Sequence, residues 1–410
     1  MAGRLHVFTS AAVNYLPKVR ALCRSVRRHH PEAVIHVVLV DEAPAWLDTR
    51  GDPFDEVIPV SALGIRDWRR WSFTHDIVEL ATAIKPFALM RLLERDDCGR
   101  VVYFDPDIVL FSRIDDILSM LDESDLALTP HQTTPERTLD AVLDNEVASL
   151  KHGIFNLGFI GVANRDEGRR FARWWSERTY ELCRADIAQG LFTDQKWLNF
   201  APVFFDRVAI VKSSRHNVAT WNLTTRRLDG DPEHGFEVDG QPLGFYHFTG
   251  FDSGAHRIMA IKNALRNASV QSLIRWYERE TAVGREDPIA AWPWAFGRYS
   301  DGVPIERWHR HLYRDRSDLR DAFPDPYDAS DANSNYRAWC AGEGLRHRAQ
   351  YESTGRGGPA PRASVNVPAS LRLLWLALSP KAGRSLRARS VAILRSEGMH
   401  GIVRRIAPRR

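Results

Sequence analysis

The order of apolar and polar residues along the chain predicts an α/β protein. Residues 4–10 (RLHVFTS) form a short run typical of a buried strand, and apolar residues then recur at helical spacing from Leu16 to Val26. Residues 33–41 (AVIHVVLVD) form a second run that is rich in β-branched residues. A strand, a helix and a strand in this order make a βαβ unit, so we expect a mostly parallel sheet with helices on both faces.

The same pattern continues to about residue 250. Further strands are predicted at residues 57–60, 101–104, 126–130, 155–162, 208–211 and 243–248, with helices at 77–94 and 167–183. Beyond them, helices are predicted at 258–279 and 305–320. We therefore expect four parts: a domain of residues 1–255, a mostly helical extension rich in Trp and Arg at 256–350, a Gly-, Pro- and Ser-rich linker at 351–370, and a basic amphipathic tail at 371–410.

Positive charge is concentrated in the tail. Residues 381–410 contain nine Lys or Arg and one acid, Glu397, a charge of +8, whereas the whole chain carries +4 and the rest therefore −4. The basic character thus belongs to the tail, so we expect no nucleic-acid binding. From Leu371 the tail alternates apolar residues with arginine, which fits either an anionic membrane surface or a solvated, partner-binding tail.

Cysteine usage and the N-terminal residues indicate a reducing compartment. The four cysteines are widely spaced and form no CxxC pair, which predicts neither a zinc site nor a disulfide framework. The first ten residues have no apolar core of signal-peptide length, and no uncharged run reaches the roughly 18 residues that cross a bilayer. We expect a cytoplasmic protein, peripheral on the inner face of the cell membrane if the tail binds lipid.

Two aspartates follow one of the predicted strands directly. Asp105 and Asp107 are separated by Pro106 and come after the buried run 101–104. Side chains two positions apart on a strand point the same way, and ligands of open α/β sheets bind beyond the carboxyl ends of the strands. A D-x-D pair is more often a solvated turn than a ligand. If it binds a ligand, a hard divalent cation, Mg²⁺ or Mn²⁺, fits two carboxylates best.

Other stretches place polar residues in similar positions. His247 ends a strand-like run, and an imidazole added to two carboxylates favours Mn²⁺. Asn156 and Gly158 lie inside an apolar strand, where glycine often marks close approach by a ligand or by another backbone segment. Asp194 and Gln195 precede a probable short helix, where they fit either an N-cap or the recognition of sugar hydroxyls.

Several of these motifs occur in a familiar order. Over residues 4–252 the chain resembles the nucleotide-sugar glycosyltransferases of the GT-A fold, and among them the bacterial-type members of glycosyltransferase family 8, the glycogenin-like group. The resemblance depends on six motifs, FTSAAVNYLPKVRALCRSV, ELATAIKPFALMRLL, VVYFDPDIVL, FNLGFIGVAN, TDQKWLN and YHFTGF. It implies a Rossmann-like, mixed and mostly parallel sheet followed by a helical extension.

The resemblance also implies an activity and a set of partners. A sugar passes from a nucleotide-sugar donor, most simply a UDP-sugar, to a hydroxyl of a glycan, glycolipid or protein acceptor, with retention of configuration, in polysaccharide or glycolipid synthesis. The metal, Mn²⁺ or Mg²⁺, is implied to be held by Asp105, Asp107 and His247. The donor is implied to contact Thr9, Ser10, Asn14, Tyr15, Lys85, Asn156, Gly158 and Gly250.

The same resemblance suggests how transfer proceeds. Gln195 matches a position on the donor side of the sugar, and an amide is a poor nucleophile. We therefore expect front-face attack by the acceptor, whose proton passes to the departing phosphate, with Asp194 as the alternative nucleophile.

The sequence also departs from the family pattern. The acidic residue near the uracil is replaced by SAAVNY, and FDSGAHR replaces the usual Lys-Pro-Trp, so Lys85 and Arg257 are the candidate phosphate cations. We interpret Trp221 as structural. For the tryptophans of the extension, helix packing is favoured over an acceptor-sugar platform; these are Trp276, Trp292, Trp294, Trp308 and Trp339.

Other classes of protein fit less well. A sugar-phosphate nucleotidyltransferase would carry a Gly-rich loop with Arg and Lys after the first strand, and an NAD-dependent oxidoreductase would carry G-x-G-x-x-G there; TSAAVNYLP has neither. A non-catalytic relative that binds nucleotide sugars remains an alternative.

Overall fold

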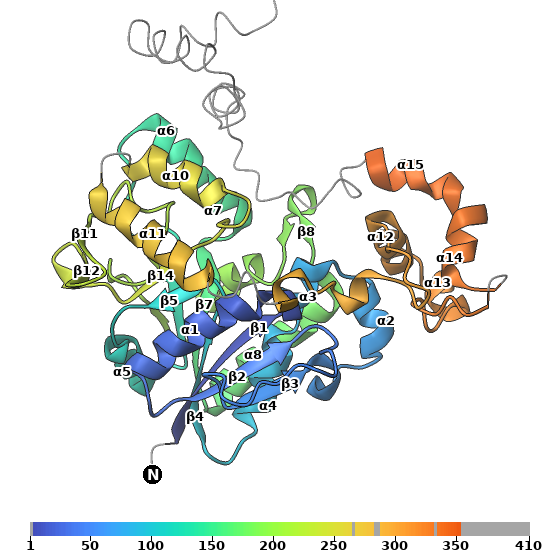
Figure 1. Ribbon diagram of the computed structural model, residues 1–410, viewed down its shortest axis with the longest axis horizontal. Coiled ribbons are helices and arrows are strands. Elements are labelled where there is room, and N and C mark those ends of the chain that lie inside the picture. Colours follow the sequence, from blue (N-terminus) through green and yellow to red (C-terminus); the bar gives the residue numbers. More distant parts are fainter. Residues whose placement is uncertain (1–2, 265–266, 283–287, 332–333, 354–410) are drawn as a thin grey trace, which may run out of the picture. The chain divides into compact units, whose positions relative to one another are not determined.

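A seven-stranded sheet forms the centre of the computed structural model, which describes residues 3–264, 267–282, 288–331 and 334–353. The strand order is β10-β6-β7-β4-β1-β2-β3, and Figure 1 labels β7, β4, β1, β2 and β3 of this sheet. All neighbours run parallel except β7, which is antiparallel to both β4 and β6. The predicted mixed, mostly parallel α/β sheet is therefore confirmed. The strands are β1 Arg4–Ala11, β2 Val34–Leu39, β3 Glu56–Pro59, β4 Cys98–Phe104, β6 Leu126–Pro130, β7 Phe155–Ala163 and β10 Val208–Ile210.

Helices cover both faces of this sheet. Neighbouring strand residues such as Val37 and Val38 belong to two different apolar cores, because side chains alternate between the faces. One core includes α4 (Lys85–Leu93) and α8 (Asp166–Leu182), and the other includes α1 (Leu16–His29) and α5 (Asp115–Glu123). The shorter helices of this part are α2 Trp68–Phe73, α3 Ile77–Ala83, α6 Leu139–Ala141, α7 Val147–His152 and α9 Ala201–Phe204.

The predicted helix at 77–94 is two helices, α3 and α4. A capping box between Asp76 and Glu79 starts α3, which ends at Ala83. Pro86 lies in the first turn of α4, where its missing N–H leaves no hydrogen bond unmade. The break places Lys85 at the start of the second helix.

Three small sheets lie beside the large one. β14 (Phe245–His247) pairs antiparallel with β5 (Ile108–Leu110), so the predicted strand 243–248 is shorter and belongs to a separate two-stranded sheet. The three-stranded sheet contains β11 Leu228–Asp231, β12 Gly235–Val238 and β13 Gln241–Pro242, and the last pair is β8 Ala185–Asp186 with β9 Leu191–Phe192. None of β5, β8, β9, β11, β12 or β13 is predicted from the apolar pattern.

The described residues between 255 and 353 are mostly helical, as predicted, but their helices are shorter than expected. Two helices, α10 (Ala255–Ala264) and α11 (Ala268–Ala282), overlap the predicted range 258–279. Two more, α12 (Arg307–Asp315) and α13 (Ser317–Ala322), overlap the predicted range 305–320. α14 (Tyr336–Trp339) and α15 (Leu345–Ser353) follow. In the described part of the chain, no helix combines the length and the apolar character needed to span a bilayer.

The tryptophans of this extension pack against the cores, as the sequence favoured. Trp308 is buried in the core that includes α4 and α8, and Trp294 and Trp339 pack against that core. Trp276 contacts Phe111, with ring centroids 5.1 Å apart. The first three residues of the predicted linker belong to α15, whereas the rest of the linker and the whole tail 371–410 lie outside the described residues. The domain boundary at residue 255 stays a prediction.

Candidate active site

Two strand ends bring a group of acidic and imidazole side chains together. Asp105 and Asp107 follow β4, and His247 ends β14. Pairing of β14 with β5 sets His247 opposite Ile108, so His247 Nε2 lies 3.1 Å from Asp107 Oδ1 and 3.7 Å from Asp105 Oδ2. One ligand atom from each of the three residues lies within 4.8 Å of the others. The structure therefore assembles the three residues that the sequence singled out for a metal.

The charges in this group oppose the effect of burial. Burial lowers the pKa of His247, but the Asp107 and Asp105 carboxylates outweigh it and the net shift is upward. Burial raises the pKa of Asp107, but His247 and Lys18 outweigh it and the net shift is downward. Two carboxylates and one imidazole are a donor set that suits a divalent cation of the Mg²⁺ or Mn²⁺ type, so the residues fit the predicted metal.

Strand β7 fixes the position of the imidazole. The Asn156 Oδ1 atom lies 3.1 Å from His247 Nδ1, so the ring's other nitrogen faces the carboxylates. A Cβ at Gly158 would lie 2.5 Å from His247 Cε1, so only glycine fits there. Gly158 O also accepts a 2.8 Å hydrogen bond from Asp105 N. The predicted close approach at Gly158 is thus to the imidazole of His247 and to the Asp105 backbone.

A buried lysine connects two of the predicted site residues. Lys85 is 2% exposed, and its Nζ lies 3.3 Å from Asp105 Oδ1 and 3.2 Å from Asp194 Oδ2. It also donates a 2.9 Å hydrogen bond to Leu157 O and lies 4.3 Å from the ring centroid of Tyr103. Burial lowers the pKa of Lys85, but the two carboxylates outweigh it and raise it. Lys85 therefore stays charged and positions Asp105 and Asp194.

The two predicted catalytic residues are held by neighbouring groups. Gln195 Oε1 accepts a 3.0 Å hydrogen bond from Leu157 N, and Gln195 Nε2 donates one of 3.0 Å to His152 O. Asp194 is buried, and burial raises its pKa although Lys85 opposes the shift. Gln195 occupies the N-cap position of the short helix Lys196–Phe200, but neither its side chain nor that of Asp194 makes a capping hydrogen bond there.

Four of the residues implied to contact the donor lie close together in the chain: Thr9 and Ser10 at the end of β1, and Asn14 and Tyr15 in the short 3-10 helix Val13–Tyr15 that follows. Ser10 Oγ donates a 2.8 Å hydrogen bond to Ala81 O and lies 3.1 Å from Tyr103 OH, which in turn donates to Asp105 Oδ1 at 2.6 Å. Thr9 Oγ1 and Asn14 Oδ1 are buried and have no hydrogen-bond partner among the described residues. Buried polar atoms without a partner are rare, so these two oxygens are candidates for ligand contacts.

The start of α1 adds a cation beside the acidic group. Lys18 Nζ forms an ion pair with Asp252 and lies 3.1 Å from Tyr15 OH, which donates a 2.9 Å hydrogen bond to Asp252 Oδ2. Asp252 lies two residues after Gly250, which has a φ of +70°. The alternative cation, Arg257, lies 3.7 Å from Glu278 and has a side chain that is 62% exposed. Lys18 therefore supplies positive charge next to Asp107 from a helix that the sequence did not single out for this role.

Trp221 borders the same group. Its ring centroid lies 5.5 Å from that of His247 and 5.3 Å from that of His131. Its indole nitrogen is buried without a hydrogen-bond partner in the described part of the chain. Trp221, which the sequence interpretation treated as structural, therefore lies against a predicted metal ligand.

Comparisons with known proteins were made with this geometry in hand. No family model matches the chain. Two uncharacterized Bacillus subtilis proteins are similar to it: YfnF is 26% identical over 257 residues (59% of this chain, 82% of YfnF), and YfnD is 26% identical over 251 residues (60% and 78%).

Solved structures similar to the chain include three transferases. The galactosyltransferase LgtC, in complex with donor and acceptor sugar analogues, is 18% identical, covers 69% of this chain and 97% of its own, and has a TM-score of 0.41. The glycosyltransferase GlyE of Streptococcus pneumoniae is 13% identical, covers 68% of this chain and 64% of its own, and has a TM-score of 0.39. Mouse xyloside xylosyltransferase 1 is 14% identical, covers 60% of this chain and 97% of its own, and has a TM-score of 0.36.

Two residues of the site escaped the sequence analysis for different reasons. Lys18 lies three residues after Tyr15, so the two side chains share one face of α1, but it is one of many basic residues of this helix. Asp252 lies on the segment that lacks the expected lysine, and its role depends on a contact with Lys18, 234 residues away. Helical spacing from Tyr15 was the one signal that pointed to Lys18.

Proposed function

We propose that the protein is a metal-dependent glycosyltransferase that moves a sugar from a nucleotide-sugar donor, most simply a UDP-sugar, to a hydroxyl group of a glycan or glycolipid. The observation that carries the proposal is the Asp105, Asp107 and His247 group, whose ligand atoms lie within 4.8 Å of one another. It lies beyond the carboxyl ends of the strands, where open α/β sheets bind ligands. The similarity to the transferases described above is consistent with this assignment.

The proposed donor site extends from this group toward α1. When bound there, Mn²⁺ or Mg²⁺ would act as a Lewis acid toward the diphosphate. Lys18 is the proposed second positive charge for the phosphates, because it lies close enough to Asp107 to lower that residue's pKa. Its partner Asp252 has a side chain that is 57% exposed, so solvent screens that carboxylate, whereas the Lys18 side chain is only 10% exposed.

The nucleoside is proposed to bind at the end of β1. The unpartnered oxygens of Thr9 and Asn14 would accept hydrogen bonds from its base or ribose. Tyr15 lies beside them, and burial followed by the charge of Asp107 raises its pKa, so the hydroxyl stays protonated and can donate.

For the transfer step we propose retention by front-face attack. The bond from the acceptor oxygen to the anomeric carbon forms while the bond from that carbon to the phosphate oxygen breaks, and the acceptor proton passes to the departing phosphate. Both ends of the Gln195 amide are already bonded to backbone, so we assign it the role of holding β7 against α7. Asp194 stays the alternative nucleophile; Lys85 lies 3.2 Å from it and opposes, without cancelling, the upward shift that burial imposes on the Asp194 pKa.

The proposal is tested with the full chain and a panel of UDP-sugars. We expect Mn²⁺-dependent hydrolysis of one donor without acceptor, and its loss in Asp107→Asn. Asp48→Asn is the matched control, because Asp48 is exposed and pairs only with Arg50 among the described residues. Saturating UDP with Mn²⁺ should also stabilise the wild type, by about 2.7 kcal/mol at one hundred times its Kd.

Two outcomes would contradict the proposal. Hydrolysis that continues at the same rate with excess chelator would remove the metal assignment. A UDP-sugar that binds with Mn²⁺ but shows neither hydrolysis nor transfer would instead support the non-catalytic relative.

A further inference from the structure

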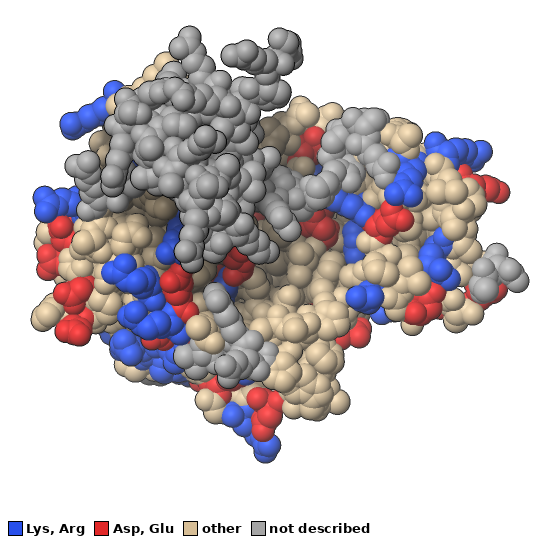
Figure 2. All heavy atoms as spheres, turned by 45° about the horizontal axis from the view of Figure 1, so that its top comes forward, with Lys and Arg blue, Asp and Glu red and all other residues tan. Residues whose placement is uncertain are grey.

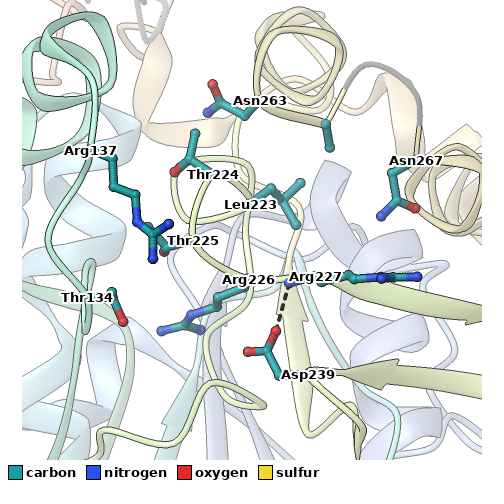
Figure 3. Close-up of a pocket in the computed structure, with 11 residues that line it drawn as sticks. Thr134, Arg137, Leu223, Thr224, Thr225, Arg226, Arg227, Asp239, Asn263 and Asn267 are labelled. Atoms are coloured by element: carbon teal, nitrogen blue, oxygen red, sulfur yellow. Dashed lines mark hydrogen bonds between the residues drawn. The ribbon is translucent and has the colours of Figure 1, made fainter.

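A polar pocket opens beside the segment that carries Trp221. Its volume is about 530 Å³, and residues 223–227 form one of its walls. Three arginines line it, Arg137, Arg226 and Arg227, against a single acid, Asp239. Figure 3 shows the guanidinium groups of Arg137 and Arg226 turned toward the same side of the pocket, whereas Arg227 points away from them.

Arg226 is a buried cation without a carboxylate partner in the described part of the chain. It is 5% exposed, and its guanidinium donates to Ser214 O at 3.0 Å, His216 O at 2.7 Å and Thr133 Oγ1 at 3.2 Å. Its Nε is buried and has no hydrogen-bond partner among the described residues. Burial lowers the pKa of Arg226 to about 10, so it still carries its charge at neutral pH. A buried charge of this kind is costly unless a counter-ion neutralises it.

The one acid of the pocket, Asp239, offsets the burial of Arg226 only in part, and no ion pair joins the two side chains among the described residues. The Asp239 carboxylate accepts a 2.9 Å hydrogen bond from Arg227 N, and the Arg227 side chain lies 3.0 Å from Asp229. The nearby Glu136 accepts hydrogen bonds of 2.6 Å from both Thr224 Oγ1 and Asn145 Nδ2. On the pocket side that Figure 3 displays, two guanidinium groups therefore remain for an anion.

Surface charge elsewhere is more balanced. On the face in Figure 2, basic and acidic side chains of the described residues lie side by side. Arg137 differs from most of these arginines, because the structure records no ion pair or hydrogen bond for its exposed side chain within the described ranges. An arginine that is exposed at a pocket and unpaired is free to bind a ligand.

The pocket is close to the proposed metal site along the chain. Trp221 contacts the ring of His247, and the pocket wall begins two residues later, at most about 7 Å of extended chain. Asn263, another pocket residue, donates a 2.6 Å hydrogen bond to Thr220 O and so ties α10 to this segment. The pocket wall and the residue that contacts His247 therefore belong to one chain segment.

We propose that this pocket binds an anionic group, a phosphate or a carboxylate, carried by the acceptor substrate. The inference rests on the proposed function, since it assigns the pocket to the acceptor of that reaction. Paired guanidinium groups recognise the oxygens of phosphates and carboxylates with charge-assisted hydrogen bonds. An acceptor held in this way is a sugar phosphate, a phosphate-linked lipid glycan or a uronic-acid glycan.

The test uses the full chain in excess chelator, so that a metal-dependent donor site does not bind phosphate. Calorimetric titrations with glucose 6-phosphate, glucuronate and glucose separate phosphate, carboxylate and neutral sugar. We expect one of the two anions to bind and glucose not to bind. Arg137→Glu should weaken that binding by about 10-fold or more, because a charged hydrogen bond is lost and a repulsion is added. Arg28→Glu, at an exposed arginine of α1, should bind like the wild type.

The inference is overturned if neither anion binds, or if Arg137→Glu and Arg28→Glu bind equally well. Hydrolysis of UDP-sugars by the wild type separates the two proposals. Anion binding that depends on Arg137, in a protein without hydrolysis, would keep the anion site and reject the glycosyltransferase. Hydrolysis of a UDP-sugar without anion binding would keep the glycosyltransferase and reject the anion site.

Discussion

A single methyl group added at Gly158 should displace His247. In the wild type this strand position has no Cβ, and the imidazole occupies the space. A Cβ built there would lie 2.5 Å from His247 Cε1, 2.7 Å from His247 Nδ1 and 2.8 Å from Asn156 Oδ1. Ordinary contacts of this kind begin at 3.4 Å. The ring would therefore have to move away by about 1 Å, since overlap of that size has a steep energetic cost.

The size of the effect follows from how closely a metal site is specified. Ligand distances in such sites vary by about 0.2 Å, so a shift of about 1 Å removes His247 from a common sphere with Asp105 and Asp107. It also breaks the hydrogen bond of His247 to Asn156, and disturbing such outer partners alone weakens metal binding about 10- to 100-fold. We expect Gly158→Ala to raise the Kd for Mn²⁺ by at least about 10-fold, which is about 1.4 kcal/mol.

The measurement is calorimetric titration of Mn²⁺ into wild type and variant, with thermal unfolding of both without metal. Gly161→Ala is the matched control, because Gly161 lies on the same strand β7 but a Cβ there would not meet His247. A Cβ there would meet Leu121 Cδ1 at 3.0 Å, the end of a flexible side chain away from the site. The control should bind Mn²⁺ as the wild type does.

Equal Mn²⁺ affinity in Gly158→Ala and the wild type would refute this reasoning, as long as the variant is folded. It would mean either that His247 is not a ligand or that the strand yields instead of the ring. Equal losses in both glycine variants would point to a general disturbance of β7.

Two further predictions concern charges. Lys18→Met should weaken Mn²⁺-dependent binding of UDP by about 10-fold while leaving binding of uridine unchanged, because only the phosphates meet the lost cation; an equal loss for both ligands in competition titrations would contradict this role. Burial lowers the pKa of His75 to about 3, so below pH 6.5 the unfolded state takes up more protons than the folded state. The free energy of unfolding therefore decreases as the pH is lowered. From pH 7 to pH 5 the free energy of unfolding should fall by about 2 kcal/mol on account of His75. Urea unfolding at both pH values should show a smaller fall in His75→Asn than in the wild type.

The parts of the fold that the sequence predicted are those with strong local patterns. The runs of β2, β4 and β7 are mostly apolar, all of β1 after Arg4 is buried, and the spacing of α1 is regular. Pro86 also marks the boundary between α3 and α4, and could have been used to predict it. The two-residue strands β8, β9 and β13 are not predicted at all, because they carry no periodic signal.

The candidate site depended on two kinds of information. Asp105 and Asp107 were found because they follow a buried strand. His247 reaches them only through the pairing of β14 with β5, which joins segments far apart in the chain, and no local pattern encodes that register. The environment of Gln195 was equally hidden, since its partners are backbone groups of Leu157 and His152. Local sequence patterns can therefore identify candidate site residues, whereas the contacts that define their roles depend on tertiary structure.

One buried arginine has a consequence for how the chain could be divided. Arg310 of α12 is 3% exposed and donates to Phe73 O at 3.0 Å and to His75 O at 2.9 Å, and it also donates to Phe296 O. Phe73 ends α2, and His75 immediately precedes the capping box of α3. A protein shortened at residue 255 would leave these carbonyls, and the apolar surface around them, without cover. The helices beyond residue 255 therefore support the fold of the residues before it, and expression trials that remove them would begin with a destabilised fragment.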